Sequence, residues 1–87
     1  MIGNFKNGDV VVKIGGRTAY VVDGTRSNSI WYGVKYLWWD KVVEADIHRF
    51  SLDADYVRVD RCVPSDDRDV HDKLIRIAKA FGRTGNQ

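Results

Sequence analysis

The sequence predicts a single small domain, residues 1–87, that is mainly β with one C-terminal helix. Apolar and polar residues alternate over much of residues 8–60, Gly and Asp punctuate this stretch, and the apolar period becomes helical after Pro64. We therefore expect a small antiparallel SH3-like barrel or sandwich of about five strands, closed by an amphipathic helix. The expected bounds are a β-barrel at 5–61, a helix at 65–82 and a frayed tail at 83–87.

The first two strands are expected to form a hairpin. Apolar residues that share one face of the first strand are Val10, Val12 and Ile14. Gly15-Gly16 is a two-residue turn signal, because glycine adopts the positive φ that tight hairpins need. Alternate residues of the second strand are Thr18, Tyr20 and Val22, and Asp23-Gly24 ends it.

A third strand is expected at residues 30–39, after a polar loop at 25–29, and it is the most aromatic. One face carries residues that we expect to point inward: Ile30, Tyr32, Val34, Tyr36 and Trp38. The other face carries residues that would then point outward: Trp31, Lys35, Leu37 and Trp39. The alternative is that the C-terminal helix covers this second face, so that Leu37 and Trp39 pack on Leu74, Ile77 and Phe81.

The next segment, residues 42–50, alternates again. Its inner face would hold Val43, Ala45 and Ile47, and its outer face Glu44, Asp46 and His48. A polar corner at 51–55 then leads to a last strand at 56–59.

The final segment has helical spacing. An apolar stripe is formed by Val70, Leu74, Ile77, Ala78 and Phe81. Ser65 or Asp66 can cap the N-terminus, and Gly82 suits the C-terminal cap. Asp69 precedes Lys73 by four residues, and Asp72 precedes Arg76 by four, so we expect two ion pairs along the helix.

Several classes of function are disfavoured by composition. A net charge of +2 does not by itself indicate nucleic acid binding, and Cys62, the single cysteine, excludes an intramolecular disulfide and a thiolate-rich zinc site. His48 and His71 have no ligand partners nearby in the sequence, so we expect no metal and no cofactor.

The chain contains no nucleophile elbow, phosphate-binding loop or His-Glu-x-x-His motif, so we do not expect an enzyme. With no secretory signal and no apolar run near the ~20 residues that span a bilayer, we expect a cytoplasmic protein without membrane contact.

A family resemblance rests on residues 5–59. The run from Phe5 to Gly16 contains a Gly-Asp-Val-Val opening and a Gly-Gly turn, and it is followed by Tyr20-Val21-Val22, by Tyr36-Leu37-Trp38-Trp39 and by Phe50. This pattern resembles the YodC-like family of small uncharacterised bacterial proteins, and its opening also occurs in SH3-like barrels. The resemblance implies a small β-fold and supplies no activity.

The candidate binding residues are aromatic and basic. Trp31, Lys35 and Trp39 would share an exposed strand face, a combination typical of protein hot spots and of surfaces on which single-stranded nucleic acid stacks. The loop residues Arg17 and Arg26 would add a basic rim at the Trp31 end, and Lys79 and Arg83 are the less compensated charges of the helix.

These observations predict a non-enzymatic protein-binding module, for example a phage or mobile-element inhibitor or adaptor that acts on a host protein complex. The alternative is a nucleic-acid-binding SH3-like barrel that uses the exposed Trp, Lys and Arg side chains. A homodimer formed through the aromatic strand would occupy the same surface.

Overall fold

The computed structural model describes residues 5–16 and 18–80. Within them the elements follow in the order β1 (Asp9–Lys13), β2 (Ala19–Asp23), the 3₁₀ helix η1 (Gly24–Arg26), β3 (Trp31–Trp38), β4 (Lys41–His48), α1 (Arg49–Asp55), β5 (Tyr56–Arg61) and α2 (Asp67–Ala80). The prediction of a mainly β structure with a C-terminal helix is confirmed.

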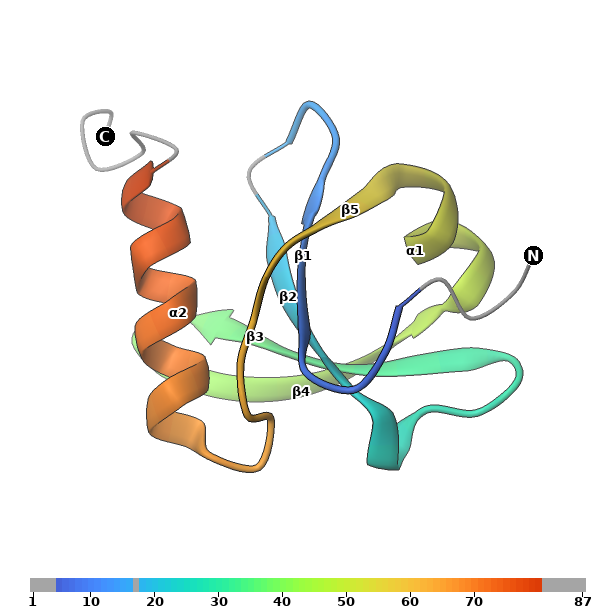
Figure 1. Ribbon diagram of the computed structural model, residues 1–87, viewed down its shortest axis with the longest axis horizontal. Coiled ribbons are helices and arrows are strands. Elements are labelled where there is room, and N and C mark those ends of the chain that lie inside the picture. Colours follow the sequence, from blue (N-terminus) through green and yellow to red (C-terminus); the bar gives the residue numbers. More distant parts are fainter. Residues whose placement is uncertain (1–4, 17, 81–87) are drawn as a thin grey trace.

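All the strands pair antiparallel in one sheet, in the order β4-β3-β2-β1-β5. In Figure 1, β3 and β4 run across the view while β1, β2 and β5 run more upright, so the sheet is strongly bent. β4 and β5 are its two edges and are not paired with each other. The sheet is therefore not closed, and the barrel stays a prediction.

The sheet is packed on both faces. One face holds a cluster of buried side chains from the strands and α1: Val11, Val22, Tyr32, Val34 and Leu52. The opposite face is covered by α2, and its buried cluster is Val10, Val12, Val21, Val70, Leu74 and Ile77. The expectation that β3 has an outward face is wrong where α2 lies over it, and Leu37 packs against this second cluster as the alternative predicted.

A glycine lets three strands meet at the start of β1. Gly8 donates its N–H to the carbonyl of Val22 and accepts from the N–H of Cys62, both at 2.8 Å. Its φ is +92°, and a Cβ atom there would stand 2.5 Å from the Cys62 carbonyl oxygen. Any larger residue would have to shift this backbone, so the Gly-Asp opening is a packing requirement.

Residues 49–55 form the helix α1, where the sequence predicts the end of a strand and a polar corner. The α1 segment has one fully buried residue, Leu52, so it carries no apolar stripe to reveal it. The His48 ring caps it, because Nδ1 accepts the Phe50 N–H at 3.1 Å.

The C-terminal helix is confirmed as α2, and Asp66 caps it by accepting the N–H groups of Arg68 and Asp69. The two expected ion pairs along it are wrong: Lys73 pairs with Asp60 of β5 at 3.7 Å, Asp69 instead accepts the N–H of Val63, and Asp72 approaches the His71 ring at 3.4 Å. The remaining helix expectations, on Phe81, Gly82 and the tail, lie outside the described residues.

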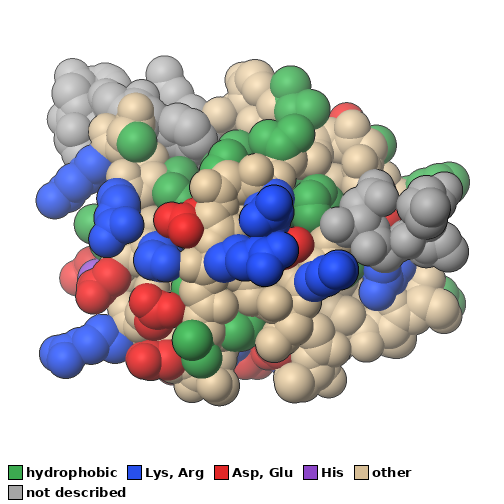
Figure 2. All heavy atoms as spheres, in the orientation of Figure 1, with side chains coloured by type: hydrophobic (Ala, Val, Ile, Leu, Met, Phe, Trp, Pro, Cys, Tyr) green, Lys and Arg blue, Asp and Glu red, His purple; other side chains and the backbone are tan. Residues whose placement is uncertain are grey.

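Several basic side chains lie on the face of the molecule over β5 and α2. Figure 2 shows Lys and Arg side chains in a row over the face where β5 and α2 lie, with carboxylates between those of α2. The exposed basic residues of these two elements are Arg58, Arg61, Arg68, Arg76 and Lys79.

Candidate functional site

The structure separates the predicted binding residues into two groups at opposite ends of β3. Trp31 begins the strand, and Trp39 follows its last residue. At ~3.3 Å per strand residue the two lie about 25 Å apart. Arg26 lies at the Trp31 end, and Lys79 follows Ala78, which lies near Trp39. Arg17 and Arg83 lie outside the described residues.

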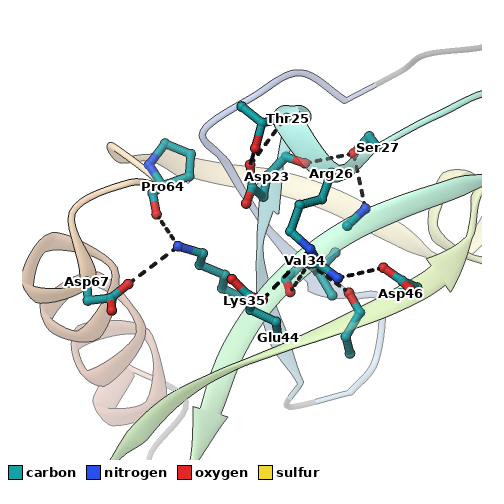
Figure 3. A network of polar contacts seen from close by, with 12 residues as sticks. Asp23, Thr25, Arg26, Ser27, Val34, Lys35, Glu44, Asp46, Pro64 and Asp67 are labelled. Carbon is teal, nitrogen blue, oxygen red and sulfur yellow. Dashed lines mark hydrogen bonds and ion pairs between the residues drawn. The ribbon is translucent and has the colours of Figure 1, made fainter.

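Lys35, between the two tryptophans, is not an exposed cation. Lys35 is 8 % exposed, and its ammonium group donates to the Pro64 carbonyl at 2.6 Å and to Asp67 Oδ1 at 3.4 Å. The expectation that it lies beside Trp31 and Trp39 on a binding face is corrected, because α2 and the segment before it cover this part of the strand. Figure 3 shows its side chain directed at Pro64 and Asp67, away from Arg26.

Arg26 lies over Gly33, on the Trp31 side of the same face. A Cβ atom on Gly33 would stand 2.5 Å from Arg26 Cβ, so the missing side chain makes room for the arginine. The guanidinium pairs with Asp46 at 2.8 Å and, more distantly, with Glu44 at 3.8 Å (Figure 3). Both partners lie on β4, opposite Gly33 and Lys35. Arg26 is therefore held by this chain's own carboxylates.

Trp31 belongs to a row of three rings. It lies opposite His48 in the β3–β4 pairing, with ring centroids 5.5 Å apart in an edge-to-face arrangement. His48 in turn lies 5.9 Å from Phe50, the second residue of α1. Trp31 is 42 % exposed and Phe50 79 % exposed, so the row presents apolar ring surface to solvent.

The backbone that carries Trp31 is fixed by its neighbours. Asn28 Oδ1 accepts the N–H groups of Ile30 and Trp31 at 2.8 and 2.9 Å, and the Asn28 N–H donates to the Trp31 carbonyl at 2.8 Å. Arg49 donates its N–H to the Ile30 carbonyl and its Nε–H to the Asn28 carbonyl, while its guanidinium lies 4.1 Å from the Tyr32 ring centroid. The loop before β3 is thus tied to the start of α1.

The opposite end of β3 has a second aromatic pair. Trp38 and Trp39 lie edge to face with centroids 6.2 Å apart, and Trp39 is 86 % exposed with a φ of 62° in the turn to β4. Trp39 borders an open groove of about 460 Å³ between the sheet and α2, lined also by Thr18, Ala19, Tyr36, Leu37, Leu74, Ile75 and Ala78. Asp40, in the same turn, approaches His71 of α2 at 3.7 Å. The alternative that Trp39 packs on the helix is therefore wrong for most of its side chain, because Trp39 only borders this groove and is otherwise exposed.

Cys62 is the single cysteine of the sequence, and it is partly buried. Burial, with a smaller effect of Asp69, raises the pKa of the Cys62 thiol to about 11, which favours the unreactive protonated form. In the described ranges, no group of three or more His, Cys, Asp or Glu side chains could hold a metal ion. Within the same ranges, no helix is long and apolar enough to cross a membrane.

Comparison with known proteins found no matching family model, no matching curated protein and no matching solved structure. The resemblance to the YodC-like family therefore stays a prediction.

The sequence predicts Trp31 as a candidate binding residue but not the residues that position it. It predicts His48 on an outer strand face, Phe50 within a strand and Asn28 in a polar loop, and it gives none of the three a role in binding. The local Asn28-x-x-Trp31 spacing was a usable signal, because an Asn side chain commonly accepts backbone N–H groups two and three residues further on.

Proposed function

We propose that this protein is a non-enzymatic protein-binding module that acts by surface contact through Trp31, His48 and Phe50, here called the aromatic row. The observation that carries this proposal is a large exposed indole on a backbone held by hydrogen bonds from Asn28 and Arg49. Rigid aromatic side chains lose little conformational entropy on binding, which is why Trp and Tyr dominate protein hot spots.

The charges near Trp31 favour protein over nucleic acid as its partner. Lys35 is buried, and Arg26 is paired with Asp46 and Glu44. A surface for single-stranded nucleic acid needs cations beside its stacking rings to meet the phosphates. On the same face the side chains of Asp46 and Glu44 are more exposed than that of Arg26, so the charge that meets solvent there is mainly negative and would repel a phosphate backbone.

The proposal is tested by affinity capture from a bacterial lysate, with nuclease and moderate salt, followed by mass spectrometry. The bait is the full chain, compared with the variants Trp31→Ala and Trp38→Ala. Trp38 is a matched control, because it is an exposed tryptophan at the other end of the same strand.

We expect a stoichiometric protein that is retained by the wild type and by Trp38→Ala and is lost with Trp31→Ala. Far-UV circular dichroism checks that both variants are folded. A partner retained equally by both variants, or no partner, would contradict the role of the aromatic row. If Trp31→Ala does not fold, Phe50→Ala takes its place, because Phe50 is 79 % exposed.

Nucleic acid binding is the second candidate, now through a different face. The row of Lys and Arg side chains over β5 and α2 supports it (Figure 2). Arg61 and Lys73 are paired with Asp9 and Asp60, which weakens the field of this face. Fluorescence anisotropy with labelled oligonucleotides discriminates the candidates, since phosphate contacts give an affinity that falls steeply with salt.

We also propose that the sheet is an SH3-like barrel left open between its edges. The strand order β4-β3-β2-β1-β5 and the short helix between β4 and β5 support this assignment.

An adaptor or inhibitor of a host protein complex, for example one from a phage or mobile element, is the cellular role that we associate with such a module. The expected homodimer is tested with the partner chemistry below.

A further inference from the structure

We infer that the partner surface is basic, and that an arginine or lysine side chain of the partner lies on the Trp31 ring and against the carboxylate of Asp46, with Glu44 adding negative charge further along β4. This inference rests on the proposed function of the aromatic row and assigns the chemistry of its ligand.

The β3–β4 register brings the indole and the carboxylates to one face. Trp31 lies opposite His48 and Gly33 opposite Asp46, and side chains of directly paired residues share a face of the sheet. Asp46 is therefore the diagonal neighbour of Trp31. Gly33 contributes no side chain between them, so the space beside the indole is bounded by Arg26 and Asp46.

Glu44 and Asp46 are two carboxylates that only one cation among the described residues, Arg26, approaches, because Lys35 on the same face is directed at Pro64 and Asp67. The side chains of Glu44 and Asp46 are 53 % and 56 % exposed, whereas that of Arg26 is 30 % exposed and approaches both of them. Arg26 satisfies one Asp46 oxygen and reaches Glu44 only at 3.8 Å, so acceptor positions on both carboxylates face solvent. Charge complementarity therefore selects a cationic partner group.

A tryptophan ring is the best aromatic partner for a cation, and arginine is the cation most often found on such rings. A guanidinium that lies on the indole can also donate to a carboxylate at the ring's edge, because its donors lie in the plane of the group. Trp31 with Asp46 offers that combination. Trp39 has a single carboxylate next to it in the sequence, Asp40, which approaches His71 at 3.7 Å, whereas the sheet face of Trp31 holds two carboxylates.

The test uses ¹⁵N-labelled full-length protein and three synthetic peptides of nine residues, made of glycine and serine with three arginines, three lysines or three glutamates. The chain has three tryptophans, whose indole N–H signals separate in a two-dimensional NMR spectrum. We expect the arginine and lysine peptides to move the Trp31 indole signal and the amide signals of Asp46 and Glu44. The glutamate peptide should move none of these signals.

Variants localise the effect. The double substitution Glu44→Gln with Asp46→Asn should weaken binding of the arginine peptide by about fivefold or more, and Trp31→Ala by a similar factor. The matched control is Asp72→Asn, which removes one exposed carboxylate from α2 and should leave the affinity unchanged. Trp31→Leu replaces Trp31→Ala if the latter does not fold, because leucine keeps apolar bulk at this position and offers no ring face to a cation.

The inference is overturned if the arginine peptide does not bind at millimolar concentration, if the glutamate peptide binds as well, or if the carboxylate double variant binds unchanged. It is also overturned if the Trp31 signal moves when the protein alone is concentrated, because the occupant is then a second copy. Trp31-dependent capture of a lysate protein without peptide binding would leave the proposed function standing and reject only the basic partner.

Discussion

Lys35 is a buried ammonium group whose closest partner is a backbone carbonyl. It joins the middle of β3 to Pro64 and, at longer range, to Asp67 at the start of α2. A charge in this position is tolerated only because the hydrogen bond to Pro64 replaces water. A residue that the sequence places with the binding surface thus has a structural role, which is to fix where α2 begins over the sheet.

Replacement of Lys35 by methionine should destabilise the fold. Methionine is unbranched and one atom shorter than lysine, and it cannot donate, so the Pro64 carbonyl loses its partner, at a cost of about 1–3 kcal/mol in the free energy of unfolding. Urea denaturation followed by circular dichroism measures this change. Lys41→Met, at the exposed turn, is the control and should change stability little. Equal stabilities of the two variants would show that the buried contact contributes nothing.

Cys62 should react slowly with iodoacetamide. Burial raises its pKa to about 11, so at pH 8 about one thiol in a thousand is the reactive thiolate. We expect the rate to rise strongly when the chain is unfolded in urea, as measured by mass spectrometry. Similar rates in the folded and unfolded protein would mean that the thiol is not protected.

At the scale of elements, the sheet depends on one helix on each face. α1 supplies Leu52 to one core, and α2 supplies Val70, Leu74 and Ile77 to the other. Because strands β1 and β2 place alternate residues in each cluster, loss of packing on either face should weaken the whole sheet.

Leu52→Ala and Leu74→Ala should each destabilise the protein by about 2–5 kcal/mol, since each removes a buried side chain and leaves a cavity. Val63→Ala, at a residue that is 54 % exposed, is the control and should cost far less. Urea unfolding monitored by tryptophan fluorescence gives all three values. A small effect of Leu74→Ala alone would indicate that α2 packs loosely and that the Leu52 core is sufficient.

Elements with a clear period could be predicted, and those without one could not. The helix α2 followed from an apolar stripe and its cap from Asp66, while the strands followed from alternation. The helix α1 could not be found because a single buried residue, Leu52, gives no period. For β3 the sequence left two alternatives, an exposed second face or one covered by the helix, because a long apolar strand looks the same whether one face or both are buried.

The candidate site was predictable only in part. Trp31 stood out as an exposed aromatic candidate, but its neighbours come from β4 and α1. The position of His48 next to Trp31 depends on the β3–β4 register, and the position of Phe50 depends on α1, a helix that the sequence did not reveal. Lys35 shows the limit most clearly, because its burial depends on Pro64, which lies 29 residues further along the chain.

The whole molecule should lose stability in alkaline solution. Burial, followed by the effect of Tyr20, raises the pKa of Tyr56 from 10.0 to about 12, and burial raises that of Cys62 from 9.0 to about 11. Folding thus favours the neutral form of both groups. Their contribution to stability is complete below pH 9 and is lost as the pH rises from 9 to 12.

Urea midpoints measured between pH 8 and pH 11 should therefore fall with pH. Tyr56→Phe should remove part of this dependence, because phenylalanine cannot ionise. A midpoint that stays constant over this range would contradict the raised pKa values.

The left-handed backbone of Trp39 has a practical consequence for preparing this protein. Asparagine adopts a positive φ more readily than tryptophan, and it would remove an indole that is 86 % exposed. Trp39→Asn is therefore the first change to make for a more soluble and more heat-resistant sample, and it leaves the aromatic row at the far end of β3 intact. Trp39 is the most exposed tryptophan of the chain, and its backbone has a positive φ that tryptophan rarely adopts. This turn therefore lowers both the stability and the solubility of the protein.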